Sequence, residues 1–218
     1  MDFEAMLDFL EELQKNNNKE WMDLNRKRYK VIRNDFVSWL DKMNKRLAEL
    51  DPLYFDTPGK KAINRINNNL LYHPNRPVYK DHFGAGLDQL SKQGDYYIQI
   101  GVNRSMLAGG YWRPDNKILK SIRDAIDYNG EELIRIMQEP KFKLMYGGLV
   151  DSESRLTQSP QAYDSDHRFI ELLKNKTFAV EQLISRKQIV DKSFDDLVVE
   201  SYLVLLPFRR YLNQAITV

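Results

Sequence analysis

The chain of 218 residues can bury one sizeable core, because its 42% hydrophobic and 29% charged residues are typical of an ordinary globular protein. Its net charge of +2, from 33 basic and 31 acidic side chains, excludes the basic excess that nucleic-acid-binding proteins usually show. The absence of cysteine excludes disulfides, thiolate nucleophiles and cysteine-based metal sites.

The chain also lacks the patterns of export and membrane insertion. Asp2 and Glu4 stand where a secretory signal needs basic residues before an apolar core. The longest apolar run, about 202–208, is interrupted by Pro207 and is far shorter than the roughly 20 residues that span a bilayer. We therefore expect a soluble, cytoplasmic protein with neither nucleic acid nor a membrane as a partner. The sequence leaves its oligomeric state open.

Helical periodicity dominates the first 50 residues. Apolar side chains at spacings of three and four predict an amphipathic helix over 3–14, which Asn16-Asn17-Asn18 then stops. The same spacing predicts one long helix over 19–50, roughly 45 Å in length. Its polar face is either a solvated surface or an anion-binding stripe. That face includes Arg26, Lys27, Lys30 and Arg33.

A block of strands follows the long helix. Residues 53–55 predict a short strand, and 62–71 a strand whose later part turns polar. Alternation over 96–102, a turn at 103–105 and a return over 106–112 predict a hairpin near 96–112. We expect most of the aromatic side chains of this hairpin to lie in the core.

The remaining segments alternate less regularly. Helices are expected to about Tyr128, over 131–138, over 168–173 and over 194–215, where Pro207 introduces a kink or delay. An irregular segment starts at Lys141, and strands are expected over 149–156 and 177–184. This order predicts an α+β fold, a largely antiparallel sheet packed against several helices, in a single domain over 1–218.

The segment 65–86 is the part of the chain least like a regular helix or strand. It holds two prolines, two of the three histidines, three basic side chains and a closing Gly84-Ala-Gly86 within 22 residues. Arginine and lysine bind carboxylate or phosphate, and histidine can add a proton near neutral pH. This pattern predicts either an anion pocket or a surface loop whose charges meet ordinary partners. The predicted ligand-binding residues are Arg65, Tyr79, Lys80, His82 and Arg113, with Arg76 in the same cluster.

Other site chemistries have no specific support in the sequence. The three histidines could join Asp81, Asp164 and Asp166 in a metal site, but their spacing matches no common template. Gly84-Ala-Gly86 is only a fragment of a dinucleotide fingerprint, and no triad spacing supports a serine hydrolase. We therefore expect no metal and no cofactor, and we assign no catalytic residue.

Several separated segments together resemble the bacterial and fungal proteins of domain-of-unknown-function family 2461, from about residue 3 to 215. The resemblance implies a single-domain α+β protein without an established activity. The segments that carry it are 9–21, Arg65-Ile66, Pro77-Val-Tyr-Lys-Asp-His-Phe-Gly-Ala85, Tyr96-Tyr97, Gly109-Gly-Tyr-Trp-Arg-Pro114 with Leu119 and Ile122-Arg123, and Pro160-Gln-Ala-Tyr-Asp-Ser-Asp-His167 with Leu172 to Lys176.

The chain departs from this family in one stretch. The family pattern is Arg-Ile-x-Arg-Asp-x-Arg-Phe-Ser, and the chain keeps its first arginine as Arg65. Three expected charges are replaced by Asn68, Asn69 and Leu71, and the serine by His73. Tyr79, Lys80 and His82 match the family. The resemblance therefore implies a reduced charged cluster in this member.

Three hypotheses follow for the function. The first is a domain that binds a small anionic ligand near Arg65, Lys80 and His82. The second is a hydrolase-like enzyme that uses His82 with Asp81 or Asp164 for proton transfer. The third is a protein–protein interaction module that presents the long helix 19–50 and the aromatic side chains as a partner surface.

Overall fold

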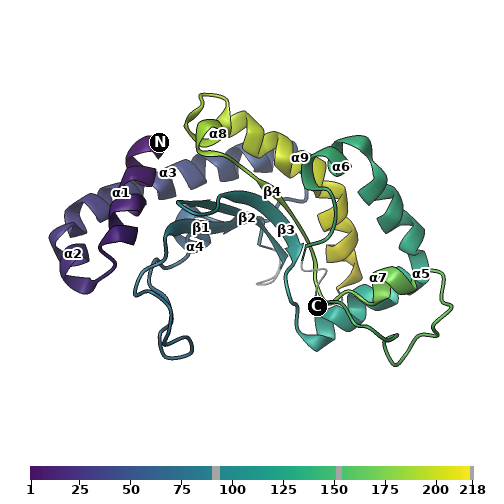
Figure 1. Ribbon diagram of the computed structural model, residues 1–218. Coiled ribbons are helices and arrows are strands. Elements are labelled where there is room, and N and C mark those ends of the chain that lie inside the picture. The colour runs from purple at the N-terminus through teal and green to yellow at the C-terminus, as the bar shows by residue number, and fades with distance from the viewer. Residues whose placement is uncertain (90–93, 151–153, 217–218) are drawn as a thin grey trace. The chain divides into compact units, whose positions relative to one another are not determined.

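The computed structural model describes residues 1–89, 94–150 and 154–216, and it confirms an α+β fold (Figure 1). Four antiparallel strands form one sheet in the order β1–β2–β3–β4. The hairpin predicted near 96–112 is present as β2 and β3. The strands are β1 His82–Leu87, β2 Gly94–Gly101, β3 Met106–Tyr111 and β4 Phe178–Leu183.

The structure contains the helical segment expected over 19–50, but Asn25 divides it into two helices. Asn18 caps the start of a short helix by accepting a hydrogen bond from the Trp21 amide. Asn25 then separates that helix from the next, because its side-chain amide donates to the Trp21 carbonyl. The helices of this part are α1 Phe3–Lys15, α2 Lys19–Leu24, α3 Arg26–Leu50 and α4 Gly59–Ala62.

The later helices follow the predicted periodicity closely. The two helices expected before and after residue 129 form α5 with a non-helical backbone at Asn129, and Pro207 lies inside α9. Pro140 begins a helix where an irregular segment was expected, because proline fits the first helical position. The bounds are α5 Asn116–Gln138, α6 Pro140–Tyr146, α7 Ile170–Leu173, α8 Arg186–Val190 and α9 Phe194–Ala215. None of the helices in the described ranges is long and apolar enough to cross a membrane.

Two expected strands before β1 are not regular strands. Residues 52–53 form a turn and 54–55 are irregular, since carboxylates accept from the amides of Leu53 and Phe55. Residues 62–71 contain the end of α4, isolated bridges and a loop. The strand expected over 149–156 includes residues 151–153, which lie outside the described part of the chain.

The chain divides into two compact units. The first comprises Met1–Gln89, Tyr97–Leu107 and Leu183–Val199, and the second Leu90–Tyr96, Ala108–Gln182 and Glu200–Val218. The expectation of a single domain remains a prediction.

A continuous set of aromatic rings forms the core of the first unit. Phe83 of β1 lies against Tyr29 and Phe36 of α3, at ring-centroid distances of 6.1 and 5.7 Å. Phe36 in turn stacks on Trp39, which stacks on Phe194 at 5.8 Å. These contacts fix β1 against α3.

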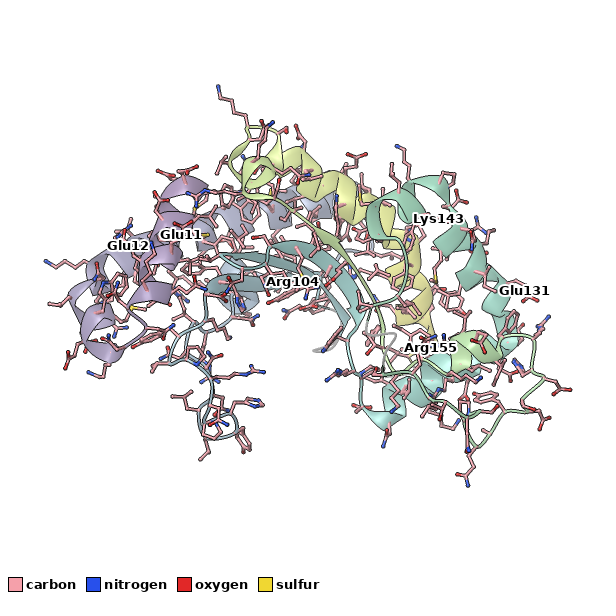
Figure 2. All side chains as sticks on the ribbon, in the orientation of Figure 1. Glu11, Glu12, Arg104, Glu131, Lys143 and Arg155 are labelled. Carbon is pink, nitrogen blue, oxygen red and sulfur yellow. The ribbon has the colours of Figure 1, made fainter. Side chains whose placement is uncertain are left out.

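Ion pairs connect α1 to its neighbours in the same unit through Glu11 and Glu12, which Figure 2 labels on α1. Glu12 binds Arg28 of α3, with 2.7 Å between the charged atoms. Glu11 binds Arg186 at the start of α8 at 2.6 Å. All four side chains are substantially exposed, so these pairs add little to stability.

The core of the second unit combines rings with buried polar groups. Phe142 of α6 packs against Phe208 of α9, with 5.5 Å between ring centroids. The hydroxyl of Tyr146 donates to the Ser201 carbonyl at 2.7 Å, and burial raises the pKa of this phenol. Arg209, 1% exposed, donates to the carbonyl of Gly94.

The register of β1 and β2 places polar groups on one face of the sheet in the first unit. Phe83, Ala85 and Leu87 are buried on the helix side. Because side chains alternate along a strand, His82 and Gly84 belong to the opposite face. Tyr97 and Gln99 of β2 are only partly buried and alternate with the buried residues Tyr96, Ile98 and Ile100. This half-exposed polar face carries the candidate site.

Candidate functional site

The segment before β1 folds back on itself as an irregular hairpin. Isolated antiparallel bridges join Ile63 to Ala85 and Asn67 to Tyr79. The Lys80 amide donates to the Ile66 carbonyl at 2.8 Å, and the Asn68 amide to the Val78 carbonyl at 3.0 Å. Residues 69–77 form the loop between the two limbs, and Figure 1 shows this loop projecting away from β1.

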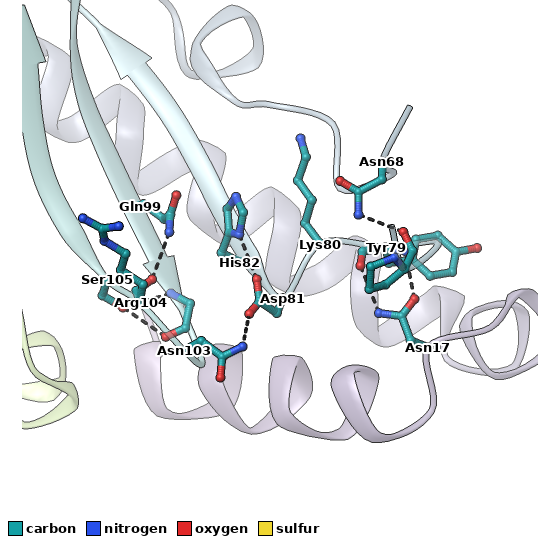
Figure 3. A network of polar contacts seen from close by, with 12 residues as sticks. Asn17, Asn68, Tyr79, Lys80, Asp81, His82, Gln99, Asn103, Arg104 and Ser105 are labelled. Atoms are coloured by element: carbon teal, nitrogen blue, oxygen red, sulfur yellow. Dashed lines mark hydrogen bonds and ion pairs between the residues drawn. The ribbon is translucent and has the colours of Figure 1, made fainter. Parts of the chain in front are cut away.

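Asn17 holds the returning limb of this hairpin. Its side-chain oxygen accepts from the Tyr79 amide and its side-chain nitrogen donates to the Tyr79 carbonyl, both at 2.9 Å (Figure 3). Asn17 thus acts as a one-residue strand partner for a backbone that lies 62 positions later in the chain. The sequence predicted only a helix stop at 16–18, because local propensity carries no information about so distant a contact.

Lys80 lies next to two arginines and is half-buried. Its ammonium group donates to the Arg65 carbonyl at 2.7 Å. Burial, together with the nearby positive charges of Arg65 and Arg76, lowers the pKa of Lys80. Within the described part of the chain, neither the Arg65 nor the Arg76 guanidinium forms a hydrogen bond or an ion pair. We call Arg65, Arg76 and Lys80 the cation cluster.

His82 and its neighbours form a second polar group beside the cation cluster. The Nδ1 atom of His82 lies 3.0 Å from Asp81, and Asn103 donates to the other oxygen of Asp81 at 2.6 Å. The side chains of His82 and Asp81 are 23% and 29% exposed. Figure 3 shows the side chains of Lys80 and His82 on the same side of the chain. The Nδ1–carboxylate contact leaves Nε2 of His82 available to a ligand.

The neighbouring strand supplies the floor of this region. A side chain at Gly84 would overlap the hydroxyl group of Tyr97, so the ring of Tyr97 lies across β1 at that position. The Tyr97 hydroxyl approaches Gln99 at 3.3 Å, and Gln99 donates to the Arg104 carbonyl at 3.0 Å. Gly84 therefore belongs to a strand and not to a phosphate-binding loop.

Two of the predicted ligand-binding residues, Tyr79 and Arg113, have surroundings different from those of Lys80 and His82. Tyr79 is only 4% exposed, and its ring lies on the opposite side of the backbone from Lys80 (Figure 3). Arg113 belongs to the second unit, has a left-handed backbone with φ of 44°, and stacks on Trp112 at 5.3 Å. A ligand-binding role for either residue remains a prediction.

A separate groove in the first unit includes none of the predicted residues. It has a volume of about 960 Å³ and runs beside the starts of α1 and α9. Three of its carboxylates have structural partners: Asp2 caps α1, Glu4 binds Arg186, and Asp195 accepts from Trp39 and Lys42. Asp35, Asp191 and Lys192 also line the groove, so its charged groups are of both signs.

The histidines are separated among different parts of the chain. His73 lies in the exposed 69–77 loop, while His82 begins β1. His167 belongs to the second unit, where its Nε2 atom lies 2.9 Å from Asp127. Over residues 1–89, 94–150 and 154–216, no three His, Asp or Glu side chains gather as metal ligands do.

Comparison with known proteins gives a family but no activity. A family model described as "Conserved hypothetical protein (DUF2461)" matches residues 5–211, which include every residue of the candidate site. No curated protein and no solved structure matches the chain. The resemblance found in the sequence is confirmed, and the functional argument depends on the geometry of the site.

Proposed function

The chain belongs to the DUF2461 family of conserved hypothetical proteins, and we propose that it is a cytoplasmic protein that binds a small anionic ligand between Arg65, Arg76 and Lys80, beside His82. One observation carries the proposal. The half-buried ammonium group of Lys80 is held next to two guanidinium groups that have no anionic partner among the described residues.

This arrangement of charges favours an anion for a simple electrostatic reason. Like charges held close together in a partly buried site repel, and an anion between them removes the repulsion. Lys80 uses one N–H on the Arg65 carbonyl, which leaves two N–H groups for a ligand. Each arginine adds a planar pair of donors that matches a carboxylate or phosphate.

His82 extends the same surface. Lys80 and His82 are two residues apart, and Figure 3 shows their side chains on the same side of the chain. In its imidazolium form, His82 donates its Nδ1–H to Asp81 and can donate its Nε2–H to a second oxygen of the ligand. A ligand with several oxygens, such as a phosphate or a dicarboxylate, fits this arrangement better than a halide.

Isothermal titration calorimetry with inorganic phosphate, pyrophosphate and citrate tests the proposal. The double variant Arg65→Ala/Lys80→Ala is expected to lose at least tenfold in affinity, since each cation contributes a charge-assisted hydrogen bond. The matched control is Lys27→Ala/Lys30→Ala, which removes the same charge from exposed lysines of α3. Unchanged binding of every anion by a folded Arg65→Ala/Lys80→Ala variant would refute the proposal.

A second candidate is hydrolysis with His82 as a general base, favoured by the 3.0 Å contact between His82 and Asp81. Asp164 belongs to the second unit and is not part of this contact. Assays with p-nitrophenyl phosphate and p-nitrophenyl acetate test this candidate. Equal turnover by the wild type and by His82→Asn would show that His82 takes no part in the hydrolysis.

A further inference from the structure

The loop between the two limbs of the irregular hairpin has an apolar end. Leu70, Leu71 and Tyr72 are 36%, 84% and 74% exposed, and we call these three residues the loop tip. Three adjacent exposed apolar side chains are unusual for a surface that meets only water. The exposure therefore points to a docking function.

The loop that carries this tip has an ordered backbone. The His73 amide donates to the Asn69 carbonyl at 3.0 Å, and the Arg76 amide donates to the His73 carbonyl at 3.1 Å. The side chain of Asn68 donates to the Pro77 carbonyl at 2.8 Å, which closes the base of the loop. The tip is thus presented by a turn with internal hydrogen bonds, in a segment that projects from β1 (Figures 1 and 2).

The charge around the loop has a single sign. No aspartate or glutamate occurs between Asp56 and Asp81, although the whole chain contains 31 acidic residues. The same interval holds five basic residues, namely Lys60, Lys61, Arg65, Arg76 and Lys80. The loop tip is therefore flanked only by positive charge, and the complementary surface is anionic.

We propose that the loop tip inserts into the interfacial layer of a membrane that contains anionic phospholipid, with lipid phosphates on the cation cluster. This inference rests on the proposed function, because the same cations take the anionic group. Membrane binding of this kind needs apolar side chains at the acyl boundary and basic residues at the level of the headgroups. It needs no membrane-spanning helix, so it departs from the expectation of no membrane partner, which rested on the absence of a spanning segment.

The dimensions of the loop agree with this arrangement. Each limb of the 69–77 loop has about four residues, so the end lies at most about 13 Å beyond the Asn68–Val78 hydrogen bond. The headgroup layer of one leaflet is about 5–8 Å thick. The tip can therefore reach the acyl boundary while the cation cluster remains among the phosphates.

The chemistry of the tip favours a membrane over the other anionic surfaces. Nucleic-acid bases stack on aromatic rings, and two of the three tip residues are leucines. A free phosphate would occupy the cation cluster and leave the tip exposed to water. A second copy of the chain would bring two clusters of the same charge together, which is unfavourable.

Vesicle sedimentation tests the membrane, with phosphatidylcholine alone and with added phosphatidylserine. The wild type is expected to bind only the vesicles with phosphatidylserine, and Leu71→Ser/Tyr72→Ser is expected to bind at least tenfold more weakly. Arg65→Ala/Lys80→Ala is expected to lose about 25-fold, about fivefold for each cation. The control Leu24→Ser/Tyr128→Ser also removes one leucine and one tyrosine side chain, but outside the loop, where these residues are 86% and 88% exposed.

A fluorescent label gives a second readout that does not depend on sedimentation. The chain has no cysteine, so Leu71→Cys takes a single environment-sensitive dye at the tip, and Leu24→Cys takes it elsewhere. A blue shift with phosphatidylserine vesicles is expected for the label at 71 and not for the label at 24. Equal emission at both positions, or unchanged vesicle binding by Leu71→Ser/Tyr72→Ser, would overturn the inference.

Titration with soluble phosphate separates this inference from the proposed function. Leu71→Ser/Tyr72→Ser is expected to keep phosphate affinity, while Arg65→Ala/Lys80→Ala loses it. Phosphate binding without any vesicle binding would overturn the membrane inference and leave the proposed function standing. Two other results would also overturn the membrane inference. One is concentration-dependent dimerisation that Leu71→Ser/Tyr72→Ser abolishes. The other is binding of single-stranded nucleic acid that depends on the loop tip, without vesicle binding.

Discussion

Replacement of Asn17 by alanine tests how the candidate site is held in place. The substitution removes two hydrogen bonds of 2.9 Å to the backbone of Tyr79. It leaves a partly buried amide and a partly buried carbonyl without their partner. Each such bond contributes about 1 kcal/mol, and the desolvated groups add to the loss, so we expect Asn17→Ala to cost about 2–3 kcal/mol.

Urea unfolding followed by tryptophan fluorescence measures this cost. Trp21 and Trp39 both belong to the first unit, so the signal reports mainly on the region that Asn17 supports. With a slope near 2–3 kcal/mol per molar urea, the midpoint is expected to fall by about 1 M at an unchanged slope. Phosphate affinity is expected to fall as well, because Lys80 follows the released residue Tyr79.

Asn16→Ala is the matched control for this experiment. The Asn16 side chain makes one exposed hydrogen bond to the Glu12 carbonyl, so its loss is expected to cost less than 1 kcal/mol. Equal midpoints for Asn16→Ala and Asn17→Ala would show that the contact with Tyr79 does not hold the segment, and the reasoning would be wrong.

Two further predictions concern the cation cluster and the floor of the site. Burial, and to a lesser extent the charges of Arg65 and Arg76, lower the pKa of Lys80. Phosphate affinity should therefore fall as the pH rises through that lowered pKa, because Lys80 loses its charge. The Lys80→Arg variant should keep its phosphate affinity at that pH, because arginine stays charged. At a pH between the lowered pKa and 10.5, Lys80 is protonated in the unfolded chain and deprotonated in the folded chain, so Lys80 makes the free energy of unfolding rise with pH. A free energy of unfolding that falls with pH in this range, and no longer does so in Lys80→Arg, would contradict this prediction. Gly84→Ala should cost about 1–3 kcal/mol because its methyl group overlaps the Tyr97 hydroxyl, and Tyr97→Phe in that background should restore part of the loss in thermal unfolding. No recovery in the double variant would exclude this overlap as the cause.

Local sequence patterns predicted most of the secondary structure. Apolar spacing located α1, α3 and α9, and alternation located the β2–β3 hairpin, since these signals depend only on nearby residues. The prediction was less accurate over 53–71. There, side chains of Asp51 and Asp88 accept backbone hydrogen bonds and replace strand pairing.

The candidate site was predicted in part. Arg65, Lys80 and His82 were selected from residue type within a non-periodic segment, and the structure describes them in one irregular hairpin and the strand that follows it. The role of Asn17 was missed, because its contact joins positions 62 residues apart. The acid-free interval between Asp56 and Asp81 is a sequence signal that could have pointed to the loop directly.

The sequence by itself determined the fold class, the family and the concentration of positive charge between residues 57 and 80. The fold class and the charge follow from composition and short-range pattern, and the family follows from the resemblance of several separated segments; all of these exist before the chain folds. Only the tertiary structure decided which charges remain without partners and which side chains face water. Burial and pairing depend on contacts between distant segments, such as Asn17 with Tyr79, Phe83 with α3, and Lys80 with Arg65.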